Sequence, residues 1–375
     1  MNMVELWMHG ISSKNPQGSV RMLKDLGFSV MVLGSARDQH EMARDVGLDT
    51  YVCTGTFSRS GEFSDESFLA VDIEGMPREW FGSTCPNRKE VREKNISTVE
   101  SALSETEAKG LMLDGCRFAS PASGLGAFFT CFCHVCEQKA KEMGYDFGRM
   151  KRDVRTLYKS IVDRRLSQTL QREPFEVANL LTSLPGVCDW LSFRADCTIE
   201  HFENVTDVVK EMGAEMGAYI FTPCLSGLVG QRYSRLRRLL DVVSPMIYRN
   251  YPDDPGPACL NKEAAALARY ISQGGFEESE AASMVTWFLG LPEQRSIDEI
   301  DAAVPEEAVA LEADRAARMF SGGPSVLPII YLGDEKVAST ALAVSRTPVD
   351  GVNFFTYRDG LEPAIELVSK RLSAE

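Results

Sequence analysis

The feature of this sequence that most constrains its fold is a regular alternation between short apolar runs and longer helical patterns. Eight runs have the length and composition of buried strands: residues 4–8, 28–33, 49–54, 110–114, 217–221, 242–248, 326–331 and 351–357. Helical patterns separate these runs, and a last one follows at residues 362–372. This alternation is typical of parallel α/β proteins. Eight strands and a closing helix predict a (β/α)8 barrel, with residues 1–375 as a single domain.

A doubly wound open sheet is the alternative α/β fold. Its dinucleotide-binding form needs a Gly-x-Gly-x-x-Gly turn after a strand, and no predicted strand is followed by one. Two connections are longer than a barrel requires, so insertions are expected at residues 58–86, after strand three, and at residues 115–146, after strand four. Residues 283–289 fit a helix or a strand, and residues 252–257 are expected to form a loop.

Composition narrows the class of function. The net charge of −14 argues against nucleic acid as a partner, because phosphate binding depends on clustered Lys and Arg. No apolar run approaches the roughly 18 residues of a membrane span, and the N-terminus has no pattern of a secretory leader. We therefore expect a soluble, cytoplasmic protein with a neutral substrate, and the sequence leaves its oligomeric state open, a homo-oligomer included.

Residues 110–136, GLMLDGCRFASPASGLGAFFTCFCHVC, combine two chemical features. An apolar strand ends on Asp114, and Arg117 follows three residues later. In a barrel of this kind the reacting groups lie at the C-terminal ends of the strands. Asp114 is therefore the leading catalytic candidate, with Arg117 as its ion-pair partner or as a contact to substrate.

The second feature of this stretch is a group of closely spaced cysteines. Cys131, Cys133 and Cys136 can surround one tetrahedral ion, and a fourth ligand must come from elsewhere in the chain. Cys85 is the preferred fourth ligand, because the insertion that carries it leaves strand three, the neighbour of strand four. Cys116 and His134 are the competitors. A closed site of this type would hold a structural zinc ion rather than activate water.

Two pieces of the sequence resemble glycoside hydrolase family 42, the zinc-containing β-galactosidases. These pieces are Cys85-Pro86-Asn87, ahead of a helix that carries Arg92, and the Cys-x-Cys-x-x-Cys run from Cys131 to Cys136. The resemblance implies that the four cysteines hold a structural zinc and that the chain is a glycosidase barrel.

The sequence departs from that family at the end of strand four. The family carries Asn-Glu there, with Glu as the acid/base, whereas this chain reads Leu113-Asp114-Gly115-Cys116-Arg117-Phe118. This form is similar to a broader group of uncharacterised glycosidase-like barrels, in which an Asp and an Arg close the strand. Further pieces are similar to the same group: Phe193-Arg194, residues 243–248 and residues 354–357.

Glycoside hydrolysis usually requires a second carboxylate. Asp334 follows strand seven, where the family resemblance places a nucleophile, and is the expected second catalytic residue. Other acidic residues near strand ends are more often solvated loop charges: Asp72, Glu74, Glu335 and Asp359.

Substrate contacts are expected from polar and aromatic side chains near strand ends and in the insertions. Trp80 is the best-placed aromatic platform, because flat sugar faces stack on indole. The full set of expected substrate contacts is Arg117, Arg194, His9, Trp80, Tyr248 and Tyr357.

Three functions of different classes follow. The first is a glycoside hydrolase acting on a carbohydrate substrate, with Asp114 and Asp334 as its carboxylates. The second is a carbohydrate-binding barrel without catalysis, since the Asn-Glu pair is missing. The third, a zinc-dependent hydrolase of the amidohydrolase kind, is disfavoured because the chain has four histidines and no His-x-His pair.

Overall fold

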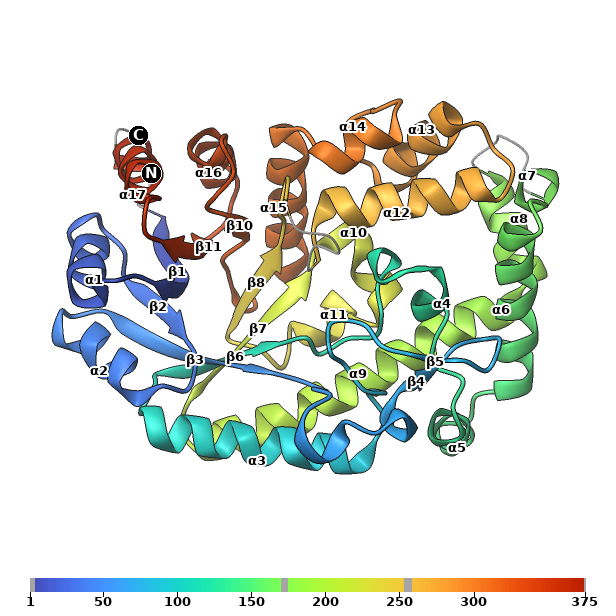
Figure 1. The fold of residues 1–375 in the computed structure, drawn as a ribbon, viewed down its shortest axis with the longest axis horizontal. Coiled ribbons are helices and arrows are strands. Elements are labelled where there is room, and N and C mark those ends of the chain that lie inside the picture. Colours follow the sequence, from blue (N-terminus) through green and yellow to red (C-terminus); the bar gives the residue numbers. More distant parts are fainter. Residues whose placement is uncertain (1–3, 170–174, 253–257, 374–375) are drawn as a thin grey trace.

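The computed structural model describes residues 4–169, 175–252 and 258–373, and its parallel strands close into a barrel (Figure 1). The strands of this sheet are β1 (Glu5–Ser12), β2 (Val30–Leu33), β3 (Asp49–Gly55), β6 (Gly110–Asp114), β7 (Glu215–Phe221), β8 (Val242–Met246), β9 (Ser325–Val326), β10 (Ile329–Tyr331) and β11 (Gly351–Arg358). Their order is β10-β11-β1-β2-β3-β6-β7-β8-β9, and Ile329 of β10 also pairs with Met246 of β8. The predicted (β/α)8 barrel is confirmed.

The seventh barrel strand is divided into β9 and β10. Pro328 lies between the two pieces and has no N–H to donate, so the hydrogen-bonded ladder is interrupted there. β9 pairs with β8, and β10 pairs with both β8 and β11. The two pieces therefore act as one strand that closes the ring.

Helices cover the outside of the barrel. They include α1 (Pro16–Asp25), α2 (Arg37–Asp45), α3 (Lys89–Thr106), α9 (Pro185–Glu211), α12 (Leu260–Gln273), α15 (Glu306–Phe320), α16 (Val337–Ser345) and α17 (Glu362–Ser373). All four residues of β2 and the first four of β6 are buried. This is expected for parallel strands that have the packed interior of the barrel on one face and helices on the other. In the described residues no helix is long and apolar enough to span a membrane.

Some sequence-based boundaries differ from the structure. The ambiguous residues 283–289 belong to helix α13 (Glu278–Leu289). Helix α6 (Phe147–Val162) ends shortly before Arg164, which adopts a positive φ of 58°. Of the loop expected at residues 252–257, residues 253–257 lie outside the described part of the chain.

The two insertions pack together beside the barrel (Figure 1). The first contains the antiparallel pair β4 (Ala70–Val71) and β5 (Pro77–Arg78), and the second contains α4 (Leu125–Phe128) and α5 (His134–Glu142). A backbone bond from Phe132 N–H to the Val71 carbonyl, 2.7 Å long, joins them. With α6 they enclose a second hydrophobic cluster, in which Trp190 stacks on Phe129 at 5.8 Å between ring centroids.

Helix α9 belongs to both hydrophobic clusters. Its N-terminal part contributes Trp190 and Phe193 to the second cluster, and its C-terminal part contributes Phe202 and Val205 to the core around the barrel. The insertions are thus packed against an element that also packs against the barrel strands.

Candidate functional site

A cavity of about 290 Å³ lies at the C-terminal ends of the barrel strands. Its lining includes four of the predicted site residues, His9, Asp114, Arg117 and Tyr248. It also includes Tyr219 and Phe355, which were not among the predicted site residues. This is the end of the barrel at which enzymes of this fold place their reacting groups. The cavity is therefore the candidate active site.

Asp114 is the last residue of β6, and its backbone is fixed by the neighbouring strand. Its carbonyl accepts hydrogen bonds from Thr56 N–H at 2.9 Å and Thr56 Oγ1 at 3.0 Å. Burial raises the pKa of the Asp114 carboxyl, and the nearby Arg117 guanidinium and Gly115 N–H partly oppose this shift. Among the described residues, Asp114 is the only carboxylate that lines the cavity.

The Arg117 guanidinium lies between two aromatic rings. Its central carbon is 4.8 Å from the ring centroid of Phe221 and 5.4 Å from that of Phe81. Within the described chain its side chain donates one hydrogen bond, to the Phe118 carbonyl at 3.1 Å, out of five N–H groups. The other N–H groups are available to water or to a ligand in the cavity.

Glu263 is a second buried carboxyl near Arg117, and no pattern in the sequence indicated it. It lies on α12, and its Oε2 accepts a hydrogen bond from Ala122 N–H at 2.7 Å. Burial raises the pKa of Glu263 to about 7, against the opposing effect of Ser120, the Ala122 N–H and Arg117. Glu263 is not part of the cavity lining, and its links toward the site are its charge interaction with Arg117 and its hydrogen bond to the loop at Ala122.

His9 and Tyr219 form a hydrogen-bonded pair in the cavity wall. Nδ1 of His9 is 2.7 Å from the Tyr219 hydroxyl, and the imidazole stacks on Phe355 at 5.2 Å between centroids. Burial lowers the pKa of His9 to about 4, so the ring is neutral at physiological pH. His9 can therefore contribute a hydrogen bond to a ligand, but not a positive charge.

Three of the expected substrate contacts lie outside the cavity lining. Arg194 is fully buried among aromatic rings, 4.6 Å from Trp190, and donates to the Ala119 carbonyl at 2.6 Å. Trp80 is only 4% exposed and packs in the second hydrophobic cluster. The Tyr357 hydroxyl bonds to Glu362 at 2.8 Å. This geometry favours packing roles for all three.

Asp334, the expected second catalytic carboxylate, is held by Arg249. Nε of Arg249 is 2.7 Å from Oδ2, and Nη2 is 2.6 Å from Oδ1. Oδ1 also accepts from Lys336 N–H at 3.0 Å. Both carboxylate oxygens are thus occupied, and Asp334 does not line the cavity.

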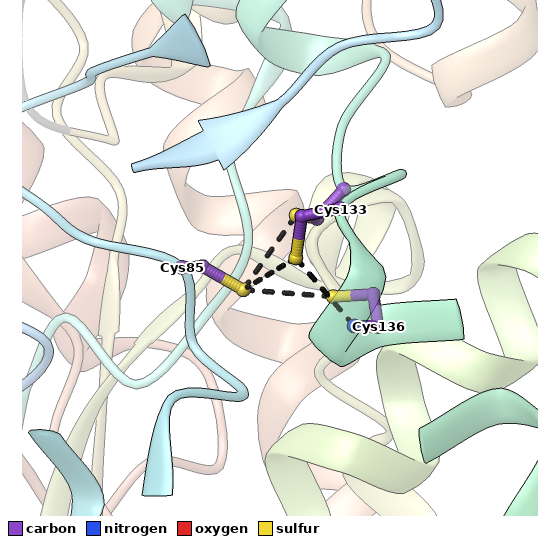
Figure 2. A group of neighbouring side chains, drawn as sticks. Cys85, Cys133 and Cys136 are labelled. Carbon is purple, nitrogen blue, oxygen red and sulfur yellow. Dashed lines mark hydrogen bonds between the residues drawn. The ribbon is translucent and has the colours of Figure 1, made fainter. Parts of the chain in front are cut away.

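Four buried cysteines meet where the two insertions join. Figure 2 labels three of them, Cys85, Cys133 and Cys136. Sγ of Cys85 lies 3.5 Å from that of Cys131, 3.7 Å from that of Cys133 and 3.5 Å from that of Cys136. All four are free thiols, and their ligand atoms lie within 4.8 Å of one another. The structure thus brings together the four residues that the sequence predicted.

The two competing ligands lie elsewhere. Cys116 is directed to the Thr198 carbonyl, 3.9 Å away, and His134 is exposed as the first residue of α5. Neither belongs to the group of side chains that could hold a metal.

The donor set fits a metal ion. Four sulfur ligands about 2.3 Å from a tetrahedral ion lie about 3.8 Å from one another, close to the separations within this cluster. Three N–H groups also point at the sulfur atoms: Asn87 Nδ2 at 3.3 Å from Cys136, Val71 N at 3.4 Å from Cys131, and Cys136 N at 3.5 Å from Cys133. Such donors stabilise thiolates around a bound metal.

Comparison with known proteins supports the fold. No protein-family model matches the chain, and no curated protein matches its sequence. The glycoside hydrolase domain of PgaB (BpsB) from Bordetella bronchiseptica superposes with a TM-score of 0.58 at 10% identity. The catalytic domain of β-amylase from Paenibacillus polymyxa superposes with a TM-score of 0.51 at 11% identity. In each pair, 99% of both chains is covered.

The Asp114→Asn substitution should stabilise the protein at neutral and alkaline pH. Because burial raises the folded-state pKa of Asp114, its contribution to stability is present at low pH and is lost as the pH rises through that pKa. The melting temperature of the variant should therefore exceed that of wild type at pH 8, and the gap should close below about pH 4. Thermal unfolding from pH 3 to 9 measures this; a variant less stable at pH 8 would contradict it.

Asp334→Ala should destabilise the fold by about 3–5 kcal/mol, because it leaves the buried Arg249 without its carboxylate. Urea unfolding followed by circular dichroism measures the loss. Glu335→Ala is the matched control, since the adjacent Glu335 is exposed and its removal should change stability little. Wild-type stability of Asp334→Ala would show that the ion pair is not structural.

Proposed function

We propose that this protein is a glycoside hydrolase in which Asp114 is one of the catalytic carboxylates. The observation that carries the proposal is the position of Asp114, partly desolvated in the cavity at the C-terminal ends of the barrel strands. The resemblance of the cysteine segments to family 42 and the likeness in fold to a PgaB glycoside hydrolase domain and a β-amylase support it. At sequence identities of 10% and 11%, these two structures support the fold of the proposed enzyme.

The chemical role that suits Asp114 best is that of a general acid. Burial raises the pKa of its carboxyl, so a larger fraction is protonated than in a solvated aspartate, and the protonated form can donate a proton to the oxygen of a departing sugar. Arg117 would stabilise the carboxylate that remains after the proton has left, or bind a substrate oxygen. We assign no second carboxylate, because the oxygens of Asp334 are bonded to Arg249.

The rest of the lining suits a carbohydrate substrate. The hydroxyls of Tyr219, Ser58 and Ser83 and the His9 imidazole can exchange hydrogen bonds with sugar hydroxyls. The Phe355 ring offers an apolar face beside them. Pockets that bind small molecules combine apolar walls with a few fixed polar groups in this way.

A carbohydrate-binding barrel without catalysis is the second candidate. It is favoured by one observation, that Asp114 is the single carboxylate among the described lining residues. Glycan binding without bond cleavage would establish it. The amidohydrolase alternative gains no support, because within the described residues the only group of side chains able to hold a metal is the cysteine cluster, which is not part of the cavity.

We also propose that Cys85, Cys131, Cys133 and Cys136 hold a structural zinc ion. Four thiolates complete a tetrahedral site and leave no position for water, so the ion would join the two insertions rather than take part in hydrolysis. We expect a cytoplasmic location for such a protein, because thiolates persist in a reducing compartment.

Asp114→Asn should lower turnover by about 10²–10⁴-fold, because the amide cannot supply the proton. Release of nitrophenol from a panel of 4-nitrophenyl glycosides identifies a substrate and measures the loss. Asp359→Asn, which changes an exposed acid after the last strand, should keep near wild-type turnover and serves as the control. Near wild-type activity of Asp114→Asn would remove Asp114 from the mechanism.

Purified protein should contain about one zinc per chain, measured by inductively coupled plasma mass spectrometry. Cys133→Ser should lose the ion and melt at a lower temperature, because metal binding contributes directly to folding. Cys116→Ser, which changes a buried thiol outside the cluster, should keep the zinc. Full stability of zinc-free wild-type protein would refute a structural ion.

A further inference from the structure

Residues 80–83 form a tight turn at the rim of the cavity. The Ser83 N–H bonds to the Trp80 carbonyl at 2.9 Å, and the two central residues both have positive φ, 47° at Phe81 and 64° at Gly82. Two consecutive positive φ values are characteristic of a type I′ turn, whose first central position favours Asn, Asp or Gly. A phenylalanine there is unusual, because a bulky side chain is strained in this region of φ.

Neighbouring segments fix the turn in place. Ser83 forms an antiparallel bridge with Ser58, and Arg59 N–H bonds to the Gly82 carbonyl at 2.6 Å. Trp80, directly before the turn, is buried in the second hydrophobic cluster, and Cys85, shortly after it, belongs to the cysteine cluster. The orientation of the turn is therefore set from both ends.

The Phe81 side chain contributes little to the protein core. It is 42% exposed, whereas Trp80 beside it is 4% exposed. One contact within the protein is with the Arg117 guanidinium, and the ring also lines the cavity. Backbone strain and an exposed aromatic ring are both unfavourable for the free protein, and strained residues of this kind cluster at ligand sites.

The cavity around Phe81 suits a flat ligand with a polar edge. Phe355 and Tyr248 provide further aromatic surface in the lining, with ring centroids 5.6 Å apart. Asp114, Arg117 and the hydroxyls of Ser58 and Ser83 supply the polar contacts. A pyranose ring presents apolar C–H faces and a rim of hydroxyls, and it matches this combination.

We propose that Phe81, and not Trp80, is the stacking platform of this site, and that it binds one face of a pyranose unit of an oligosaccharide. The choice of a sugar as ligand rests on the proposed glycosidase function. The assignment of Phe81 as a ligand contact rests on the turn, the exposure and the position of its side chain.

The Phe81→Asn substitution removes the aromatic ring but should preserve the turn, because Asn is a preferred residue at this position of a type I′ turn. Binding is measured by isothermal titration calorimetry with cellotetraose, maltotetraose, chitotetraose and β-1,4-galactotetraose. The unmodified chain and the Asp114→Asn variant, each with and without the Phe81 change, are compared. The Phe81→Asn change should weaken the best-bound tetrasaccharide about tenfold and leave the melting temperature equal or higher, whereas Phe81→Trp should retain binding.

Each outcome decides one claim. Unchanged affinity of Phe81→Asn, or weaker affinity together with a lower melting temperature, would overturn the platform, since the second result indicates a structural role. If none of the four tetrasaccharides binds to either parent protein, the pyranose assignment is overturned. If one binds and depends on Phe81 but the unmodified chain releases no reducing ends from it, the platform stands and the proposed hydrolysis fails.

Discussion

Closure of the barrel is the constraint on which the candidate site depends. The pairing of β10 with both β8 and β11 makes the sheet a ring, so the C-terminal ends of all its strands face one small volume. The register then selects neighbours: His9 lies opposite Phe355 in the β1–β11 ladder, and Gly55 lies opposite Asp114 in the β3–β6 ladder. Residues from widely separated parts of the chain therefore line one cavity.

The features that the sequence predicted correctly are those that depend on local patterns of residues. Eight apolar runs predicted the barrel. Because reacting groups lie at the C-terminal ends of barrel strands, residues near these ends were expected at the site, and four of them line the cavity: His9, Asp114, Arg117 and Tyr248. The spacing of Cys131, Cys133 and Cys136 is also local, so the cysteine cluster was predictable once Cys85 had been chosen as its fourth member. These predictions needed the position of a residue along its own strand or loop, and no knowledge of distant side chains.

Other expectations depended on packing that no local pattern records. The ion pair between Arg249 and Asp334 joins residues 85 positions apart, and the sequence could present Asp334 only as a strand-end carboxylate. Tyr357 lies near the end of β11, where its hydroxyl reaches Glu362 at the start of α17. Trp80 and Phe81 are adjacent, yet the backbone turn buries the first and exposes the second. Glu263 lies on an ordinary helical pattern, and only the fold brings it near Arg117.

Helix α9 contributes residues both to the hydrophobic core around the barrel and to the second cluster beneath the insertions. It is a continuous helix of 27 residues, about 40 Å long, and each half packs in a different hydrophobic cluster. If one hydrophobic cluster opened, its half of α9 would expose apolar residues while the other half stayed packed. Opening of either cluster alone is therefore unfavourable in free energy. Ordering at the cysteine cluster should therefore slow the exchange with solvent of amide protons on the barrel half of α9 as well.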